Sequence, residues 1–174
     1  LLIDEIQTGW YRTGKAMGYM HFGVDPDIIS MAKAMGGGMP IGAICAKAKV
    51  ATAFNPGSHG TTYGGNPVCC AAAYAQIQEM IAQKVGDNAA EVGEYFMAEL
   101  RKLPHVTEVR GGGLLVGMIL DIPRAVDIKH NALDRNLLVT AIGTGIVRMV
   151  PPLIATKEDC DKACSILKES IEAL

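Results

Sequence analysis

Two short segments contain residue types that could bind and react with one small ligand. Asp4 follows the apolar run Leu1-Leu2-Ile3, and Lys33 lies between the apolar run 28–31 and three consecutive glycines. A carboxylate can hold a protonated ring nitrogen, and a lysine amine can bond covalently to a carbonyl group. If both runs are strands, the sequence predicts that Asp4 and Lys33 lie at neighbouring strand ends and hold the same ligand.

Each of these residues also has a simpler structural explanation. An isolated Asp is more often a strand-end or turn residue, and most lysines are solvated surface cations. Lys33 differs from the other lysines because an apolar run precedes it and Gly36-Gly37-Gly38 follow, which lets backbone and ligand approach closely. Glu5 should point to the opposite face of the strand from Asp4, and we expect it to have a structural role.

The composition excludes several classes of function. The 174 residues carry a formal net charge of -2 and contain no run of Lys or Arg, which argues against nucleic-acid binding. No apolar stretch reaches the roughly 18 residues of a membrane span, and the N-terminus lacks the pattern of a signal peptide. These features predict a cytoplasmic protein that does not enter a membrane.

The cysteines favour packing over metal binding or cross-linking. The five cysteines are odd in number and lack paired CxxC spacing, so neither a disulfide framework nor a structural zinc site is expected. Cys160 and Cys164 should share a helix face with Leu167 and Ile171, as buried small hydrophobic side chains do. We therefore predict no metal site and reduced thiols, which also fit a cytosolic compartment.

The first residues resemble a strand that has lost its neighbours. A carboxylate at the C-terminal end of a buried strand belongs where open α/β sheets bind ligands, and such sheets need several βα units around it. Because the chain opens directly on Leu1-Leu2-Ile3, we expect it to be a fragment of a longer protein.

The remaining pattern predicts an α/β chain with a domain boundary near residue 85, dividing it into residues 1–85 and 86–174. The expected elements, in chain order, are a short helical piece at 17–22, strands at 28–32 and 41–46, a polar loop at 55–67, a helix at 68–83 capped by Asn66, a break at 86–88, a helix ending at Pro104, strands at 106–110 and 114–120, a helix at 124–136, strands at 137–139 and 146–150, and a closing helix to about residue 173 that starts with a Thr156–Asp159 capping box.

Several motifs together resemble one enzyme family. The motifs are Asp4-Glu5-Ile6-Gln7-Thr8-Gly9, Arg12-Thr13-Gly14, Pro26-Asp27-Ile28, Ala32-Lys33-Ala34-Met35-Gly36-Gly37-Gly38, His59-Gly60-Thr61-Thr62-Tyr63-Gly64-Gly65-Asn66-Pro67 and Arg148-Met149-Val150-Pro151-Pro152-Leu153. They resemble the class-III pyridoxal-phosphate-dependent aminotransferases, and the loop at 57–67 is most similar to acetylornithine and ornithine aminotransferases. The similarity covers the whole chain but only about the C-terminal half of such an enzyme. It implies the C-terminal part of a fold-type-I α/β transferase, with part of the large-domain sheet in 1–85 and the small C-terminal domain in 86–174.

The resemblance assigns roles around the cofactor. It implies that Asp4 pairs with the protonated ring nitrogen of pyridoxal phosphate, which strengthens the ring as an electron sink. Gln7 would reach the phenolate oxygen of the cofactor. Lys33 would form the Schiff base and, once displaced by substrate, move a proton between substrate carbon and cofactor carbon. A surface loop is the alternative explanation for Gln7.

Three further residues are assigned by the same resemblance. Thr62 is similar to a threonine that binds the cofactor phosphate across a dimer interface, with Thr61 as a weaker candidate, although a turn threonine is the alternative for both. Arg148 would grip a substrate carboxylate, because a guanidinium makes two parallel hydrogen bonds with a carboxylate. A homodimer with shared active sites is therefore implied.

The implied reaction moves an amino group from N-acetylornithine or ornithine to 2-oxoglutarate, in arginine biosynthesis or related metabolism. Another class-III enzyme, acting on 4-aminobutyrate, another ω-amino acid or glutamate-1-semialdehyde, is an alternative, as is a noncatalytic fragment. In the family, the N-terminal half supplies a phosphate-binding loop and an aromatic side chain that stacks on the cofactor ring. Neither is found in this sequence, so we expect the isolated chain to have little or no activity.

Overall fold

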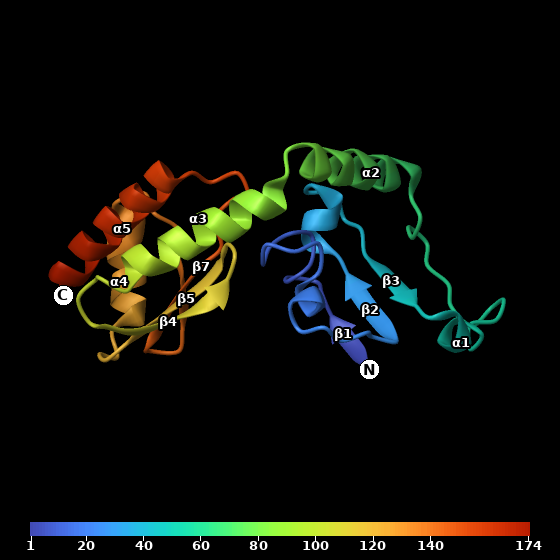
Figure 1. The fold of residues 1–174 in the computed structure, drawn as a ribbon, viewed down its shortest axis with the longest axis horizontal. Coiled ribbons are helices and arrows are strands. Elements are labelled where there is room, and N and C mark those ends of the chain that lie inside the picture. The colour runs from blue at the N-terminus through green and yellow to red at the C-terminus, as the bar shows by residue number, and fades with distance from the viewer.

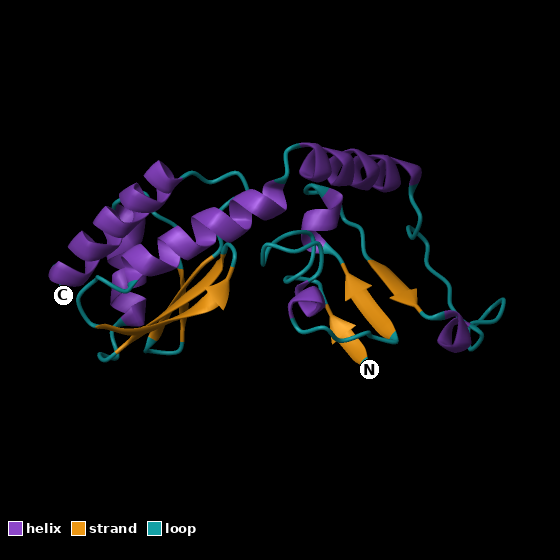
Figure 2. Ribbon diagram, viewed as in Figure 1, coloured by secondary structure: helices purple, strands orange, loops and turns teal.

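The computed structural model describes all 174 residues as two α/β units that lie side by side (Figures 1 and 2). The N-terminal unit contains β1–β3, α1 and α2, and the C-terminal unit contains α3–α5 and β4–β7. The predicted α/β class is confirmed. None of the helices combines the length and the hydrophobicity needed to cross a bilayer.

The sheet of the N-terminal unit has three strands in the order β1-β2-β3. Strand β1 (Leu2–Asp4) pairs in parallel with β2 (Ile28–Met31), and β3 (Ala43–Ala46) pairs with β2 in the antiparallel direction. Short 3-10 turns follow at Gly18–His21 and Lys33–Gly36. The expected strands at 28–32 and 41–46 are thus present, the second in shortened form.

Helix α2 (Pro67–Ala82) closes the N-terminal unit and starts as the sequence predicts. The side-chain Oδ1 of Asn66 accepts hydrogen bonds from the backbone N–H groups of Val68 and Cys69, at 3.0 and 3.3 Å, which caps the helix. A short helix, α1 (Ala48–Ala51), precedes it and was not predicted.

The predicted break at 86–88 is wrong, because these residues lie inside α3 (Val85–Leu100). The break falls instead at Lys84, whose φ of +51° ends the preceding turn. Gly86 is needed for packing: a Cβ at this position would lie 2.7 Å from the ring of Tyr11 and 3.0 Å from the carbonyl oxygen of Gly14. Tertiary contact rather than helix propensity therefore explains this glycine.

The C-terminal unit is a four-stranded antiparallel sheet in the order β4-β5-β7-β6, with three helices above it (Figure 1). Its elements are β4 (Val106–Gly112), β5 (Leu115–Leu120), α4 (Ala125–Asp134), β6 (Thr140–Ile142), β7 (Ile146–Met149) and α5 (Lys157–Glu172). Helices α3 and α4 contact the sheet, and α5 packs on both helices.

The predicted strand at 137–139 is also wrong, since the strand begins at Thr140. Asn136 has a φ of +63°, and the N–H of Leu137 donates to the carbonyl oxygen of Ala132. These residues form the left-handed ending of α4, so the backbone of Leu137 is occupied by the helix terminus rather than by a strand partner.

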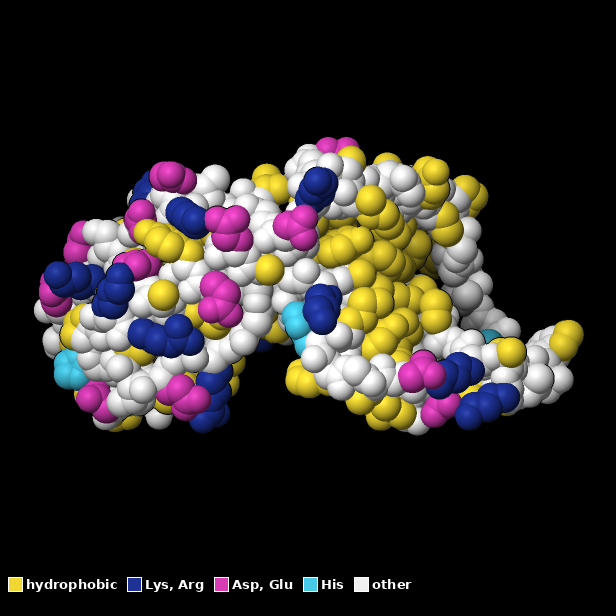
Figure 3. Space-filling view, in the orientation of Figure 1, with side chains coloured by type: hydrophobic (Ala, Val, Ile, Leu, Met, Phe, Trp, Pro, Cys, Tyr) yellow, Lys and Arg dark blue, Asp and Glu magenta, His cyan; other side chains and the backbone are white.

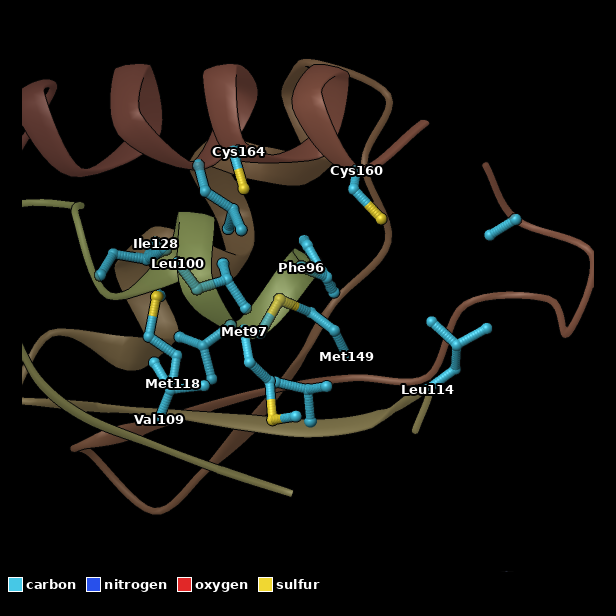
Figure 4. Close-up of a cluster of buried hydrophobic side chains, with 14 of the residues drawn as sticks. Phe96, Met97, Leu100, Val109, Leu114, Met118, Ile128, Met149, Cys160 and Cys164 are labelled. Atoms are coloured by element: carbon cyan, nitrogen blue, oxygen red, sulfur yellow. The ribbon is translucent and has the colours of Figure 1, made fainter. Parts of the chain in front are cut away.

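The main core lies in the C-terminal unit, between the sheet and its helices (Figure 4). Leu100, Met118 and Ile128 are fully buried there. Cys160 and Cys164 point into the same core from α5, which confirms their assignment as buried hydrophobic side chains. The capping box at the start of α5 is present as predicted.

Candidate active site

The parallel register of β1 with β2 brings Asp4 and Lys33 to the same edge of the sheet. Asp4 is the last residue of β1 and pairs with Ser30 of β2, and Lys33 begins the turn that follows β2. The carboxyl ends of parallel strands are where open α/β sheets bind ligands. The predicted arrangement of neighbouring strand ends is therefore observed.

The carboxylate of Asp4 is exposed and only partly occupied by protein donors. Its Oδ1 accepts a hydrogen bond of 2.8 Å from the backbone N–H of Ile6, which fixes the direction of the side chain. Its Oδ2 has no protein hydrogen bond, and Asp4 lines a large hollow of about 780 Å³ that opens between the two units (Figure 3). One carboxylate oxygen is thus free to accept a proton-bearing group from a ligand.

Lys33 is held in an unusual backbone conformation with a free amine. Its φ of +48° lies in the left-handed region, which costs a non-glycine residue roughly 1 kcal/mol. The ammonium group has neither a hydrogen bond nor an ion pair with the protein. Met35 and Gly36 of the same turn are buried beneath it. Lys84 also combines a left-handed φ, +51°, with an unpaired amine, so the case for Lys33 rests on its position directly after β2.

The glycines after Lys33 have a different use from the predicted one. A Cβ on Gly36 would lie 2.7 Å from Cγ2 of Ile41, and one on Gly37 would lie 2.9 Å from Oε1 of Gln76 in α2. Gly37 also has a φ of +58°. These two glycines therefore form a tight turn against the protein itself, and only Gly38 borders open space.

Glu5 has the structural role that the sequence predicts. Its side chain is 1% exposed. Its Oε2 accepts hydrogen bonds from the Thr8 hydroxyl at 2.6 Å and the Gly18 N–H at 2.9 Å, and its Oε1 accepts one from the Tyr19 N–H at 2.7 Å. The carboxylate thereby ties together the two ends of the loop that carries Gln7. Thr8 is three residues from Glu5, but the sequence contains no local signal for Gly18 and Tyr19, which are 13 and 14 residues away.

Gln7 and Arg148 line a second hollow of about 330 Å³, here called the arginine hollow. The Nε atom of Arg148 is buried there without a hydrogen-bond partner, and its guanidinium makes no ion pair. Gly111 and Leu115 line both this hollow and the large hollow beside Asp4, so the two spaces adjoin. Arg148 is half-buried, and a guanidinium with a buried, unpaired Nε is well suited to an anionic ligand group.

The structure does not bring the threonines to this site. Thr61 and Thr62 are exposed in the loop between α1 and α2, at the end of the molecule away from the C-terminal unit (Figure 1). The hydroxyl of Thr61 accepts a 3.1 Å hydrogen bond from the N–H of Gly64 within that loop. Neither threonine lines the hollows that contain Asp4, Gln7 or Arg148.

A comparison with known proteins identifies the family. The model of the family "Aminotransferase class-III" matches residues 1–171. Acetylornithine aminotransferase of Gloeobacter violaceus is 46% identical over 173 residues, covering 97% of this chain and 43% of that protein. This chain belongs to the class-III aminotransferase family.

Solved structures agree with this assignment. Ornithine delta-aminotransferase of Plasmodium falciparum superposes with a TM-score of 0.92 at 36% identity, over 99% of this chain and 46% of that one. Ornithine aminotransferase of Toxoplasma gondii, described with partial occupancy of pyridoxal phosphate at its active site, superposes with a TM-score of 0.91 at 34% identity. The match covers 99% of this chain and 42% of that one. The chain thus spans less than half the length of these relatives.

The residues at the sheet edge fit pyridoxal phosphate, the cofactor that class-III aminotransferases use. The free oxygen of Asp4 suits the ring nitrogen, and the free amine of Lys33 suits the aldehyde carbon. The side chain of Gln7 is half-buried and has no protein hydrogen bond, so its amide can donate to the phenolate oxygen. These three side chains are of the types that the cofactor requires, although Asp4 and Gln7 line different, adjoining hollows and Lys33 lines neither of them.

Proposed function

We propose that this chain supplies the C-terminal half of an aminotransferase that moves an ω-amino group from N-acetylornithine or ornithine to 2-oxoglutarate. The observation that carries the proposal is the parallel pairing of β1 with β2, which presents a free carboxylate and a free amine at one sheet edge. The names of the similar relatives support the substrate assignment.

Pyridoxal phosphate, when bound, supplies an electron sink that stabilises negative charge at the reacting carbon of the substrate. The role of Asp4 is to keep a proton on the ring nitrogen by pairing with it. Its Ile6 hydrogen bond fixes the carboxylate in place before any ligand arrives, so no reorganisation is needed. Gln7 orients the cofactor through its amide group.

Lys33 has two roles in this proposal. Its amine holds the cofactor in the absence of substrate, and it moves a proton at the reacting carbon during transfer. The φ of +48° sets the direction in which the Lys33 side chain leaves the turn after β2, and its flexible stem leaves the exposed amine free to move between these two roles.

Arg148 is the proposed carboxylate-binding residue. Its buried Nε has no protein partner, which leaves the guanidinium free to form a bidentate pair with the carboxylate of the amino acid or of the oxo acid. A 4-aminobutyrate-type enzyme is the alternative, because the same arginine would also bind that substrate's carboxylate.

The remaining features of the proposal concern organisation. We assign residues 1–85 to the C-terminal portion of the large cofactor-binding domain and 86–174 to the small domain. Thr62, with Thr61 beside it, would bind the cofactor phosphate across a dimer interface, as the resemblance to the family implies; neither residue lines the two hollows of its own chain. The enzyme is then a homodimer. All five cysteines are unpaired, which supports a cytoplasmic location. The acetylornithine aminotransferases among the similar relatives support a role in arginine biosynthesis or related metabolism.

The test uses the product of the complete coding region that contains this chain. Transfer to 2-oxoglutarate is measured with N-acetylornithine, ornithine and 4-aminobutyrate as donors. We expect the highest kcat/KM with N-acetylornithine or ornithine, and a rise in KM with Arg148→Met. A preference for 4-aminobutyrate would favour the alternative, and the absence of transfer with any donor would refute the proposal.

A further inference from the structure

The two units meet along a short strip formed by residues 11–14. Gly14 lies against Ala90 of α3, where an added Cβ would be 3.1 Å from the Ala90 side chain. Gly113, in the turn between β4 and β5, packs against the other side of the strip, since an added Cβ there would lie 2.6 Å from the carbonyl oxygen of Arg12. The strip is therefore held closely between helix α3 and the β4–β5 turn.

Arg12 makes the polar connections of this strip. Its Nη1 donates to the carbonyl oxygen of Leu114 at 3.0 Å and to that of Pro151 at 2.5 Å. Its own carbonyl oxygen accepts a hydrogen bond of 3.0 Å from the N–H of Leu114. One residue of the N-terminal unit thus binds two separate segments of the C-terminal unit, the β4–β5 turn and the segment that follows β7.

The environment of Arg12 is unusual for a structural arginine. Burial lowers the pKa of its guanidinium, and it forms no ion pair with any carboxylate. Arg12 is half-buried, and two backbone carbonyl groups rather than a carboxylate accept hydrogen bonds from its charged guanidinium.

The geometry that Arg12 fixes is the relative position of two proposed ligand-binding residues. Gln7 belongs to the same loop as Arg12, and Arg148 lies at the end of β7, directly before the segment whose Pro151 carbonyl accepts from Arg12. Both Gln7 and Arg148 line the arginine hollow. A shift between the two units would therefore change the distance between them.

We propose that Arg12 is a positioning residue that holds Arg148 in register with the Asp4–Gln7 loop by bridging the Leu114 and Pro151 carbonyls. This inference rests on the proposed function, because it assigns the carboxylate-binding role to Arg148. Arg12 itself touches neither the cofactor residues nor the reacting groups. Arg12 affects substrate binding only indirectly, because its bridge sets the position of the C-terminal unit and therefore of Arg148.

The simplest alternative is that the aliphatic stem of Arg12 only packs between the units. Two substitutions separate these explanations. Arg12→Met retains an unbranched apolar stem and removes both hydrogen bonds. Arg12→Lys retains a charged donor on a stem that is shorter by about one bond, so it can restore part of the bridge. Arg101→Met is the control, because Arg101 is exposed and makes no side-chain hydrogen bond.

The first readout is backbone amide exchange in the full-length protein. With the bridge lost, Arg12→Met should exchange the Leu114 amide at least about tenfold faster, because its acceptor is the Arg12 carbonyl. The exchange rate of the Leu114 amide in Arg12→Lys should lie between the rates in Arg12→Met and in the wild type, and the rate in Arg101→Met should equal that of the wild type. Exchange in α5, which does not touch the strip, should be unchanged in all variants.

The second readout is ligand binding at Arg148, measured with glutarate as a nonreacting dicarboxylate and with 2-oxoglutarate as substrate. A misplacement of about 1 Å can cost on the order of 100-fold, so we expect glutarate Kd and 2-oxoglutarate KM to rise by roughly 10- to 100-fold in Arg12→Met. The change in kcat should be smaller, and Arg12→Lys should recover part of the loss.

The outcomes separate this inference from the proposed function. Covalent attachment of pyridoxal phosphate at Lys33 should be unaffected in Arg12→Met, since Arg12 acts on the other unit. Wild-type values of Kd, KM and Leu114 exchange in Arg12→Met would overturn the positioning role while leaving the proposed function intact. A wild-type protein that binds no glutarate and is not modified at Lys33 would instead refute the proposed function itself.

Discussion

Replacement of Glu5 by Gln should loosen the loop that carries Gln7 and Arg12 without changing the size of the side chain. The Glu5 carboxylate accepts three hydrogen bonds, two on Oε2 and one on Oε1, and is 1% exposed. A carboxylate accepts on both oxygens, whereas an amide has one acceptor and one donor group. In either orientation, the amide NH2 therefore faces the backbone N–H of Gly18 or Tyr19.

The magnitude follows from that count. One buried N–H without an acceptor costs about 1–3 kcal/mol, and about 2 kcal/mol corresponds to a roughly 30-fold change in an opening equilibrium. We expect Glu5→Gln to lower the free energy of unfolding of the N-terminal unit by about this amount. The Thr8 hydroxyl can reverse its hydrogen bond, so it should contribute little.

The assay is amide hydrogen exchange of Gly18 and Tyr19, together with denaturant unfolding. In Glu5→Gln, one of these two amides should exchange tens of times faster than in the wild type. The control is Glu94→Gln, because Glu94 is exposed and unpaired, and such changes usually stay within about 0.5 kcal/mol. If Glu5→Gln matched Glu94→Gln in both measurements, the assignment of Glu5 as the anchor of this loop would be wrong.

Two further predictions concern packing and the thiols. Gly93→Ala should destabilise the C-terminal unit by about 1–3 kcal/mol in denaturant unfolding, because the added Cβ would lie 2.1 Å from the carbonyl oxygen of Gly113. Unchanged stability would contradict the close packing of α3 on the turn between β4 and β5. Cys45 and Cys70 are exposed and should be alkylated rapidly at neutral pH, whereas burial raises the pKa of Cys164 to about 12, so mass spectrometry should find it modified only after unfolding. The pKa of Cys164 is higher in the folded than in the unfolded protein, so the stability that its protonated thiol contributes is complete below about pH 9 and is lost as the pH rises through about 12. If Cys164 were alkylated as fast as Cys45, its assignment as a buried thiol would be wrong.

The elements that the sequence predicts well are those with local signals. The Asn66 cap and the Thr156–Asp159 capping box place the starts of α2 and α5 correctly, because capping depends on residues within one turn. The apolar runs before Asp4 and Lys33 are strands for a similarly local reason. Strand alternation also predicts that Glu5 points to the opposite face from Asp4 and has a structural role.

The features that the sequence does not reveal depend on contacts between distant segments. Gly86 breaks no helix, because the ring of Tyr11 occupies the space of its missing side chain. Arg12 resembles an ordinary turn residue, and its two carbonyl partners lie far along the chain. The same limit applies to Lys33, whose left-handed backbone is imposed by the buried turn after it rather than by its own preferences.

The site itself was partly predictable. The sequence placed Asp4 and Lys33 at adjacent strand ends, and the β1–β2 register shows this arrangement. That Gln7 and Arg148 line one hollow is a consequence of how the two units pack, for which the sequence has no local signal. The roles assigned to these four residues in catalysis and binding remain predictions.

The most direct test of the central proposal is to find which amine holds the cofactor. The full-length protein is mixed with pyridoxal phosphate, reduced with borohydride and digested, and the modified peptides are identified by mass spectrometry. We predict stoichiometric modification of Lys33, its loss in Lys33→Ala, and little modification of exposed lysines such as Lys15 and Lys49. Modification spread evenly over the surface lysines, with Lys33 no more reactive than Lys15, would contradict the account.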